Sequence, residues 1–282
     1  MSTLREKRKK ERRALRRRKT ADWTVVLILC AIAVCCGGYL IYHHWSVKQR
    51  ELEYEKLRQE ETLSAATETV IAEPETEEST EETVIYCDPV YDFGQLHEQN
   101  EDIYAWIVVP GTQVDYPLLQ SGTDNYYLDY NLDHSKGYPG CIYTNQCNRK
   151  DFSDYNTVLY GHNMKNGSMF GSIHSFEDET FFDEHPYIYV YTENERLTYE
   201  IYEAAKFTDV YIPSEYVISS KDDRDQFLAD VREKVSDNKL HVREDMEIGE
   251  EDRLITLSTC VSGERNHRYL VIGVLVETAL YR

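Results

Sequence analysis

The longest apolar stretch of the chain runs over residues 23–42, twenty residues without a single charge. That is about the length that a helix needs to cross the hydrocarbon core of a bilayer. Aromatic residues lie near both ends, namely Trp23, Tyr39, Tyr42 and Trp45, as they do at membrane interfaces. No small-x-small cleavage site follows the stretch. The pattern therefore predicts a single, uncleaved transmembrane signal anchor over residues 23–42.

Charge is unevenly distributed around this stretch. Residues 1–20 contain eleven Lys and Arg and two Glu, whereas the whole chain has a formal net charge of −20. Because basic flanks stay in the cytoplasm, residues 1–22 are predicted to be a basic cytoplasmic tail, with the remaining chain outside the cell. A basic arm can also bind nucleic acid. Attraction to anionic lipid head groups explains this one, so no nucleic-acid partner is predicted.

The segment after the anchor has few apolar residues. Residues 46–63 mix charged and apolar positions, which predicts a solvated helix or, as the alternative, a short coiled coil. Residues 64–83 consist largely of Ala, Thr, Ser and Glu and cannot bury enough apolar surface to fold. Residues 43–85 are therefore predicted to form a helical and disordered acidic stalk, which carries a globular domain over residues 86–282.

Short apolar and β-branched runs dominate the region beyond residue 84. They occur at 106–109, 140–143, 157–160, 188–191, 197–204, 254–257 and 268–276. Alternation of apolar and polar positions is clearest in 197–204. Two helices are also predicted, over 93–103 and over 221–235, and the second has its apolar residues at helical spacing. Many short strands with few helices predict a mostly-β domain, either a barrel or a sandwich.

Cysteine and acidic patterns do not indicate a metal or a cofactor. Only four cysteines lie outside the predicted anchor, too few for a disulfide scaffold, and no C-x-x-C pair suggests a zinc ribbon. The acidic residues at 222–225 lack the glycine and the spacing of an EF-hand loop. No glycine-rich phosphate loop is present. Whether Cys141 and Cys147 form a disulfide stays open, because connectivity does not follow from sequence.

One cysteine stands where a reactive thiol could form. Cys260 follows the strand predicted at 254–257, and Arg268 begins the next strand. If these strands pair antiparallel, Cys260 and Arg268 share one end of the sheet, and a thiol beside a fixed cation becomes a reactive thiolate. The alternative is a buried, inert cysteine. His162 stands just past the strand at 157–160 and is the candidate acid and base for the thiol.

Several motifs resemble the class B sortases, cysteine transpeptidases of Gram-positive bacteria. Residues 256–260 match the sortase Thr-Leu-x-Thr-Cys signature, and Arg268 leads the following strand as the family's arginine does. Residues 160–164 resemble the histidine segment of class B, and the helix at 221–235 resembles the one inserted before the cysteine strand. The short Cys-to-Arg connection departs from some members and leaves Arg265 as an alternative to Arg268. Further matching segments occur in family order at 100–107, 116–120 and 125–128.

The resemblance covers roughly residues 90–282 and implies both a fold and a reaction. The implied fold is a sortase-like closed β-barrel of about eight strands with N-terminal helices. One long helix precedes the cysteine strand, and a single transmembrane helix precedes the domain. The implied reaction is cleavage after Thr in the C-terminal sorting pentapeptide of a secreted protein, through a thioacyl intermediate. That acyl group then passes to an amine of the cell-wall peptidoglycan precursor or to a pilin lysine.

Roles for individual residues follow from the same resemblance. Cys260 is the expected nucleophile and His162 the acid and base, while Arg268 is expected to hold the substrate and the oxyanion. Residues expected to bind substrate are Ser258, Leu128, Tyr211 and Ile212, although a packing role is an equal alternative for the last three.

Two other function classes remain open from the sequence. A membrane-anchored extracellular cysteine peptidase would use the same thiol but release its product to water. A surface adhesin or receptor would keep Cys260 as a structural residue. The signature of L,D-transpeptidases, Ser/Thr-His-Gly-Cys, is absent. The predicted location is the cell membrane, as a single-pass protein with an extracellular catalytic domain.

Overall fold

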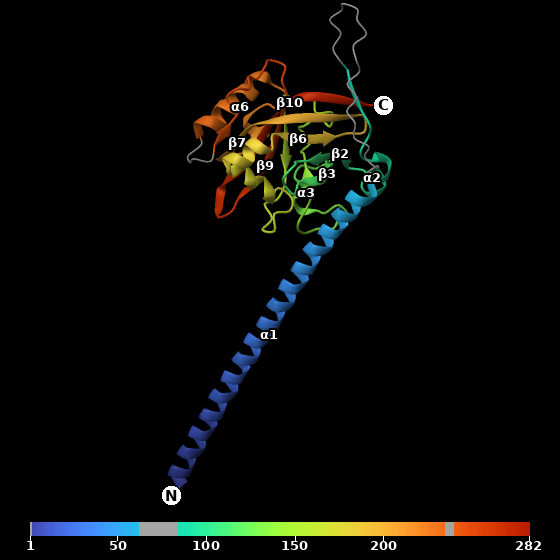
Figure 1. The fold of residues 1–282 in the computed structure, drawn as a ribbon. Helices are drawn as coiled ribbons and strands as arrows, with labels where there is room; N and C mark the ends of the chain where they lie inside the picture. The colour runs from blue at the N-terminus through green and yellow to red at the C-terminus, as the bar shows by residue number, and fades with distance from the viewer. Residues whose placement is uncertain (1, 62–83, 235–239) are drawn as a thin grey trace, which may run out of the picture. The chain divides into compact units, whose positions relative to one another are not determined.

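The computed structural model describes the backbone of residues 2–61, 84–234 and 240–282 (Figure 1). The chain divides into two compact units, Met1–Glu53 and Tyr54–Arg282. The linker predicted over residues 64–83 lies outside the described residues.

Helix α1 (Ser2–Glu61) contains the charge-free stretch. Its segment Trp23–Gln59 is long and apolar enough to cross a membrane. Most of the large apolar side chains of this stretch are exposed, among them Leu27, Leu29 and Leu40, as lipid-facing residues must be. By length and composition, this helix is a candidate membrane anchor.

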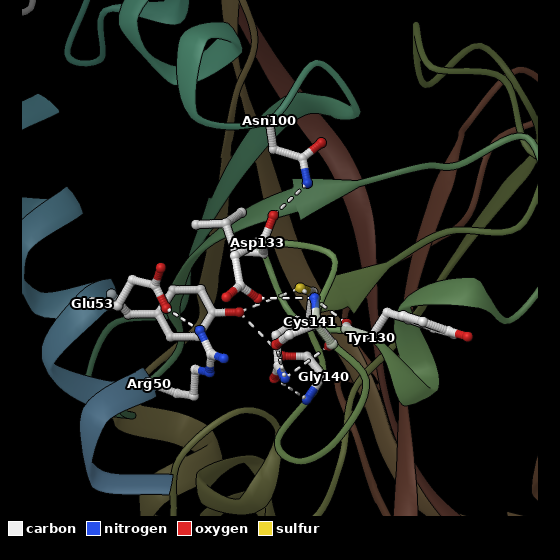
Figure 2. Close-up of polar contacts among 11 residues, drawn as sticks. Arg50, Glu53, Asn100, Tyr130, Asp133, Gly140 and Cys141 are labelled. Atoms are coloured by element: carbon white, nitrogen blue, oxygen red, sulfur yellow. Dashed lines mark hydrogen bonds and ion pairs between the residues drawn. The ribbon is translucent and has the colours of Figure 1, made fainter. Parts of the chain in front are cut away.

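The last turns of α1 belong to the second unit and pack into its core. Tyr54 and Leu57 are only 4% and 3% exposed, and the Tyr54 hydroxyl donates to the carbonyl of Gly140 at 3.1 Å. Figure 2 shows Gly140 and Cys141 on the loop that this hydroxyl meets. The prediction of a helix over residues 46–63 is confirmed as far as Glu61, but the prediction that it is solvated is wrong at Tyr54 and Leu57.

Eight strands close into a barrel in the order β10-β9-β5-β4-β3-β2-β6-β7, and β7 pairs back onto β10. This confirms the predicted closed barrel of about eight strands. The barrel strands are β2 (Ile103–Val108), β3 (Asp115–Leu119), β4 (Ile142–Tyr143), β5 (Asn156–Tyr160), β6 (Tyr187–Tyr191), β7 (Glu195–Thr208), β9 (Leu254–Val261) and β10 (Glu264–Tyr281). Two short strands extend the sheet, β1 (Ile85–Cys87) beside β10 and β8 (His241–Val242) beside β7.

Alternation along the strands separates two hydrophobic clusters. On β10, Tyr269 belongs to the main cluster, which draws on every barrel strand, whereas its neighbour Leu270 belongs to a second cluster. Successive strand residues point to opposite faces, so the main cluster fills the barrel and the second lies on its outer face. Helix α6 (Lys221–Lys234) lies over that outer face (Figure 1). Its Phe227 and Val231 belong to the second cluster. The helix predicted before the cysteine strand is thereby confirmed.

The remaining helices are short. Helix α2 (Phe93–Gln99) begins at Asp92, whose side chain accepts hydrogen bonds from two backbone amides of the first turn. The helix ends at Gln99, earlier than the predicted end at residue 103, because Ile103 already pairs in β2. The others are α3 (Tyr126–Asp129), the 3-10 helix η1 (Gly171–Glu177), α4 (Glu179–Glu184) and α5 (Ile212–Glu215).

Candidate active site

Strand β9 carries Cys260 to the point where the strand leaves the core. Residues 254–259 are buried, and Cys260 is exposed as a free thiol. The Thr259 hydroxyl donates to the carbonyl of Gly161 at 2.8 Å, which ties this end of β9 to the segment after β5. The strand end therefore presents the sulfur to solvent from a fixed backbone.

Arg268 lies directly beside Cys260 on the next strand. The predicted antiparallel pairing of the two strands is confirmed, with Arg268 and Cys260 as register partners. Register partners in an antiparallel pair project from the same face of the sheet. Arg265, the alternative cation, precedes this paired segment and is exposed. The register therefore places Arg268, rather than Arg265, opposite the thiol.

His162 lies beside Cys260 on the other side. Strands β5 and β9 pair in parallel with a constant offset, since Asn156 pairs with Leu254 and Tyr160 with Ser258 (254 − 156 = 258 − 160 = 98). Beyond the last pair, the Gly161 amide donates to the carbonyl of Ser258 at 3.3 Å and Asn163 Nδ2 donates to the carbonyl of Cys260 at 2.7 Å, so the segment with His162 runs beside Cys260. Cys260 thus lies between a histidine and an arginine at the ends of three adjacent strands, β5, β9 and β10.

Neighbouring groups hold the imidazole of His162. Its Nε2 lies 2.8 Å from the carbonyl oxygen of Leu128, and the Tyr138 ring lies 4.8 Å away, centroid to centroid. A carbonyl oxygen only accepts, so Nε2 carries a hydrogen in this arrangement. The neutral ring then has its lone pair on Nδ1, which leaves Nδ1 as the basic nitrogen.

This end of the barrel brings His162, Cys260 and Arg268 together on neighbouring segments, and it can be compared with known proteins. The family described as "Sortase domain" matches residues 107–276, which is more than half of the chain and includes His162, Cys260 and Arg268. This chain belongs to the sortase family.

The curated relatives that match this chain are both named sortase B. The chain is 34% identical to sortase B of Listeria monocytogenes over 168 residues, which are 58% of this chain and 65% of that protein. It is 26% identical to sortase B of Staphylococcus aureus over 261 residues, which are 91% of this chain and 97% of that protein. The first match therefore spans just under two thirds of its relative, and the second nearly all of it.

Solved structures agree with these relatives. The Clostridium perfringens sortase B structure superposes with a TM-score of 0.59 at 30% identity, covering 66% of this chain and 100% of that one. A Staphylococcus aureus sortase B–substrate complex gives a TM-score of 0.60 at 25% identity, covering 82% and 97%. The predicted resemblance to class B sortases is confirmed.

The four residues predicted to bind substrate have different environments in this sortase. Leu128 and Tyr211 are 38% and 37% exposed, and the Tyr211 ring stacks on Tyr160 of β5. Ile212 is 2% exposed within the cluster covered by α6, and Ser258 is buried as well. Leu128 and Tyr211 therefore offer surface near the site, while Ile212 contributes packing.

Burial moves the pKa of the Tyr211 hydroxyl further above physiological pH, at which an ordinary tyrosine is already protonated. It raises the pKa of Tyr211 to about 12, although a hydrogen bond from Asn145 at 2.9 Å acts in the opposite direction. The hydroxyl is therefore a neutral hydrogen-bond donor at physiological pH.

Three further thiols lie in the second unit. Burial raises the pKa of Cys87 and of Cys147, and Cys141 is buried. No disulfide joins Cys141 and Cys147, which answers the question that the sequence left open. No group of three or more His, Cys, Asp or Glu side chains suited to a metal occurs in the part of the chain that the structure describes.

Two residues near the thiol were not predicted from the sequence. Asn163 and His174 both contact the carbonyl oxygen of Cys260. His174 is partly buried and stacks on Tyr269 at 4.9 Å between ring centroids. Asn163 could have been singled out from the sequence, because it directly follows His162. No local signal existed for His174, because η1 brings it to β9 only through the fold.

Proposed function

We propose that this sortase is a class B cysteine transpeptidase, with Cys260 as nucleophile, His162 as acid and base, and Arg268 as oxyanion ligand. The observation that supports this is the exposed Cys260 on β9, with Arg268 as its register partner on β10 and the His162 segment following β5 on the other side. The similarity to the Staphylococcus aureus sortase B–substrate complex supports a sortase-type substrate. The proposed substrate is a secreted protein with a C-terminal sorting pentapeptide.

In the first step the Cys260 thiolate attacks the carbonyl carbon of the sorting-motif Thr. A sulfur–carbon bond forms, and negative charge develops on the carbonyl oxygen. Arg268 stays protonated, so its role is to donate hydrogen bonds to that oxygen. As the intermediate collapses, the carbon–nitrogen bond breaks and His162 gives its proton to the departing amine. The enzyme is left as a thioester.

In the second step an amine takes the place of the departed peptide. Neutral His162 accepts a proton from the acceptor amine, which attacks the thioester carbon and displaces the thiolate. Because Nε2 of His162 donates to the Leu128 carbonyl, Nδ1 is the nitrogen that exchanges the proton. The proposed acceptor is an amine of the peptidoglycan precursor or a pilin lysine.

The proposed reaction takes place at the outer face of the membrane. In this arrangement residues 1–22 are cytoplasmic, residues 23–42 cross the bilayer, and residues 86–282 form the catalytic domain. Of the stalk predicted over residues 43–85, Tyr54 and Leu57 pack into the core of the second unit. The basic residues before the apolar stretch support this orientation. A tethered enzyme meets membrane-delayed secreted proteins and lipid-linked acceptors at a high effective concentration.

The test uses the full chain in detergent micelles with labelled candidate sorting peptides. We expect intact-mass spectrometry to show a thioacyl adduct on Cys260 in the wild type and none in Cys260→Ala. Cys147→Ala is the matched control, because it removes another exposed thiol and should form the adduct normally.

Adding an amine acceptor separates the alternatives. A transpeptidase yields the amide product, whereas a peptidase yields only the free acid. An adhesin or receptor forms no adduct at all. The proposal is wrong if Cys260→Ala still joins peptide to amine.

A further inference from the structure

Two side chains from outside β9 hold the carbonyl oxygen of Cys260. Asn163 Nδ2 donates to it at 2.7 Å, and His174 Nε2 lies 3.0 Å from it. A carbonyl oxygen only accepts, so in this contact His174 Nε2 must carry the hydrogen; the same nitrogen also lies 3.0 Å from Nδ2 of Asn163. The peptide group that follows the thiol is therefore held from two directions.

The His174 ring is itself held on two sides. Its Nδ1 lies 2.7 Å from Oε1 of Glu177 in the same 3-10 helix, and its face stacks on the buried ring of Tyr269 at an interplanar angle of 23°. Nδ1 thus faces a carboxylate oxygen, while Nε2 lies between the Cys260 carbonyl oxygen and the Asn163 amide. Tyr269 neighbours Arg268 on β10, so this contact fixes η1 against the strand that carries the arginine.

Asn163 connects the two segments that carry the nucleophile and the base. The ladder between β5 and β9 ends at Tyr160 and Ser258, so the segment with His162 lies beyond the last regular pair. Asn163 follows His162 directly and bonds the backbone of Cys260, and it also donates to the Ser262 hydroxyl at 3.2 Å. Movement of the histidine segment away from the thiol would break these bonds.

We propose that Asn163 and His174 are positioning residues for the transpeptidation. They clamp the Cys260 carbonyl and so fix the sulfur relative to His162 and Arg268, with Glu177 orienting the His174 ring. This inference rests on the proposed function. Misplacing a reacting group by about 1 Å can cost about a hundredfold in rate, so the clamp affects the rate of acylation more than the binding of peptide.

The surroundings allow the clamp to be tested by substitution. Asn163, His174 and Glu177 line an open hollow of about 520 Å³. Water can enter such a space in place of a truncated side chain. Variants at these positions are therefore expected to fold.

The experiment measures single-turnover acylation of full-length protein in micelles, together with kcat, KM and the melting temperature. Asn163→Asp keeps the shape and removes both donors, and His174→Ala removes the ring. Each should lower kcat at least about tenfold, within the hundredfold that misplacement can cost, while KM stays within about threefold. His174→Gln places an amide donor near the position of Nε2 and should restore most of the rate.

His97→Ala is the matched control, because His97 Nε2 also contacts a backbone carbonyl, that of Ile103, at 2.9 Å. It should leave the acylation rate unchanged. Wild-type rates in Asn163→Asp and His174→Ala, with Cys260→Ala inactive, would refute the clamp and leave the proposed function standing. Equal losses in His97→Ala, or no rescue by His174→Gln, would also refute it. Absence of acylation in the wild type would instead refute the proposed function.

Discussion

A buried carboxyl under α6 makes the stability of this domain depend on pH. The Glu203 side chain on β7 is 0% exposed, and its Oε2 lies 3.3 Å from Nε of Arg232. Within the described residues, Oε1 has no hydrogen-bond partner. Burial raises the pKa of Glu203 from its ordinary value of 4.5 to about 7, even though Arg232 acts to lower it.

The sign of the effect follows from proton binding. Below about pH 4.5 the carboxyl is protonated in both the folded and the unfolded state, and the raised pKa costs nothing. Between 4.5 and about 7 the folded state keeps the proton while the unfolded state has released it, so stability falls as pH rises. The pKa difference (7 − 4.5, about 2.5) corresponds to about 3 kcal/mol of lost stability above pH 7, at about 1.4 kcal/mol per unit.

The perturbation is Glu203→Gln, which keeps the shape and cannot ionise. We expect the variant to gain about 3 kcal/mol relative to the wild type between pH 4.5 and pH 8, because the wild type alone loses that amount. Urea unfolding of the full chain in micelles, followed by tryptophan fluorescence at several pH values, gives the free-energy difference at each pH. Other carboxyls contribute equally to both proteins and cancel in this difference.

The measurement at pH 4.5 serves as the internal control, since the carboxyl is then largely protonated in the folded state. A free-energy difference between variant and wild type that stays constant from pH 4.5 to pH 8 would refute the raised pKa. A stability advantage of the variant that shrinks as the pH rises would refute the argument that burial raises the pKa.

Two further substitutions test the geometry of the site. Gly140→Ala should lower stability by at least about 1–2 kcal/mol in urea unfolding, because its φ is +68° and a Cβ would lie 2.6 Å and 2.9 Å from the carbonyl oxygens of Tyr127 and Leu128. Its control is Gly122→Ala, which has open space around it and should change neither stability nor activity. Arg268→Lys keeps the charge but loses the planar fork, so single-turnover acylation should fall about a hundredfold. An unchanged rate in that variant would contradict the oxyanion role.

Local sequence pattern was enough to predict several parts of this protein. The apolar stretch at 23–42 predicts its helix because length and absence of charge are local properties. The pairing of Cys260 with Arg268 was predictable for the same reason, since a short turn joins their strands and leaves few possible registers. Helix α6 was predictable from its own periodicity.

Only the tertiary structure decided how distant segments meet. His162 lies beside Cys260 because β5 and β9 pair in parallel across an offset of 98 residues, and no local pattern specifies that partner. Tyr54 and Leu57 are buried because the barrel offers them a surface, although their own segment is mostly polar. The clamp on the Cys260 carbonyl has the same origin. Periodicity states which side chains face a core, whereas pairing between strands far apart in sequence depends on the packing of the whole domain.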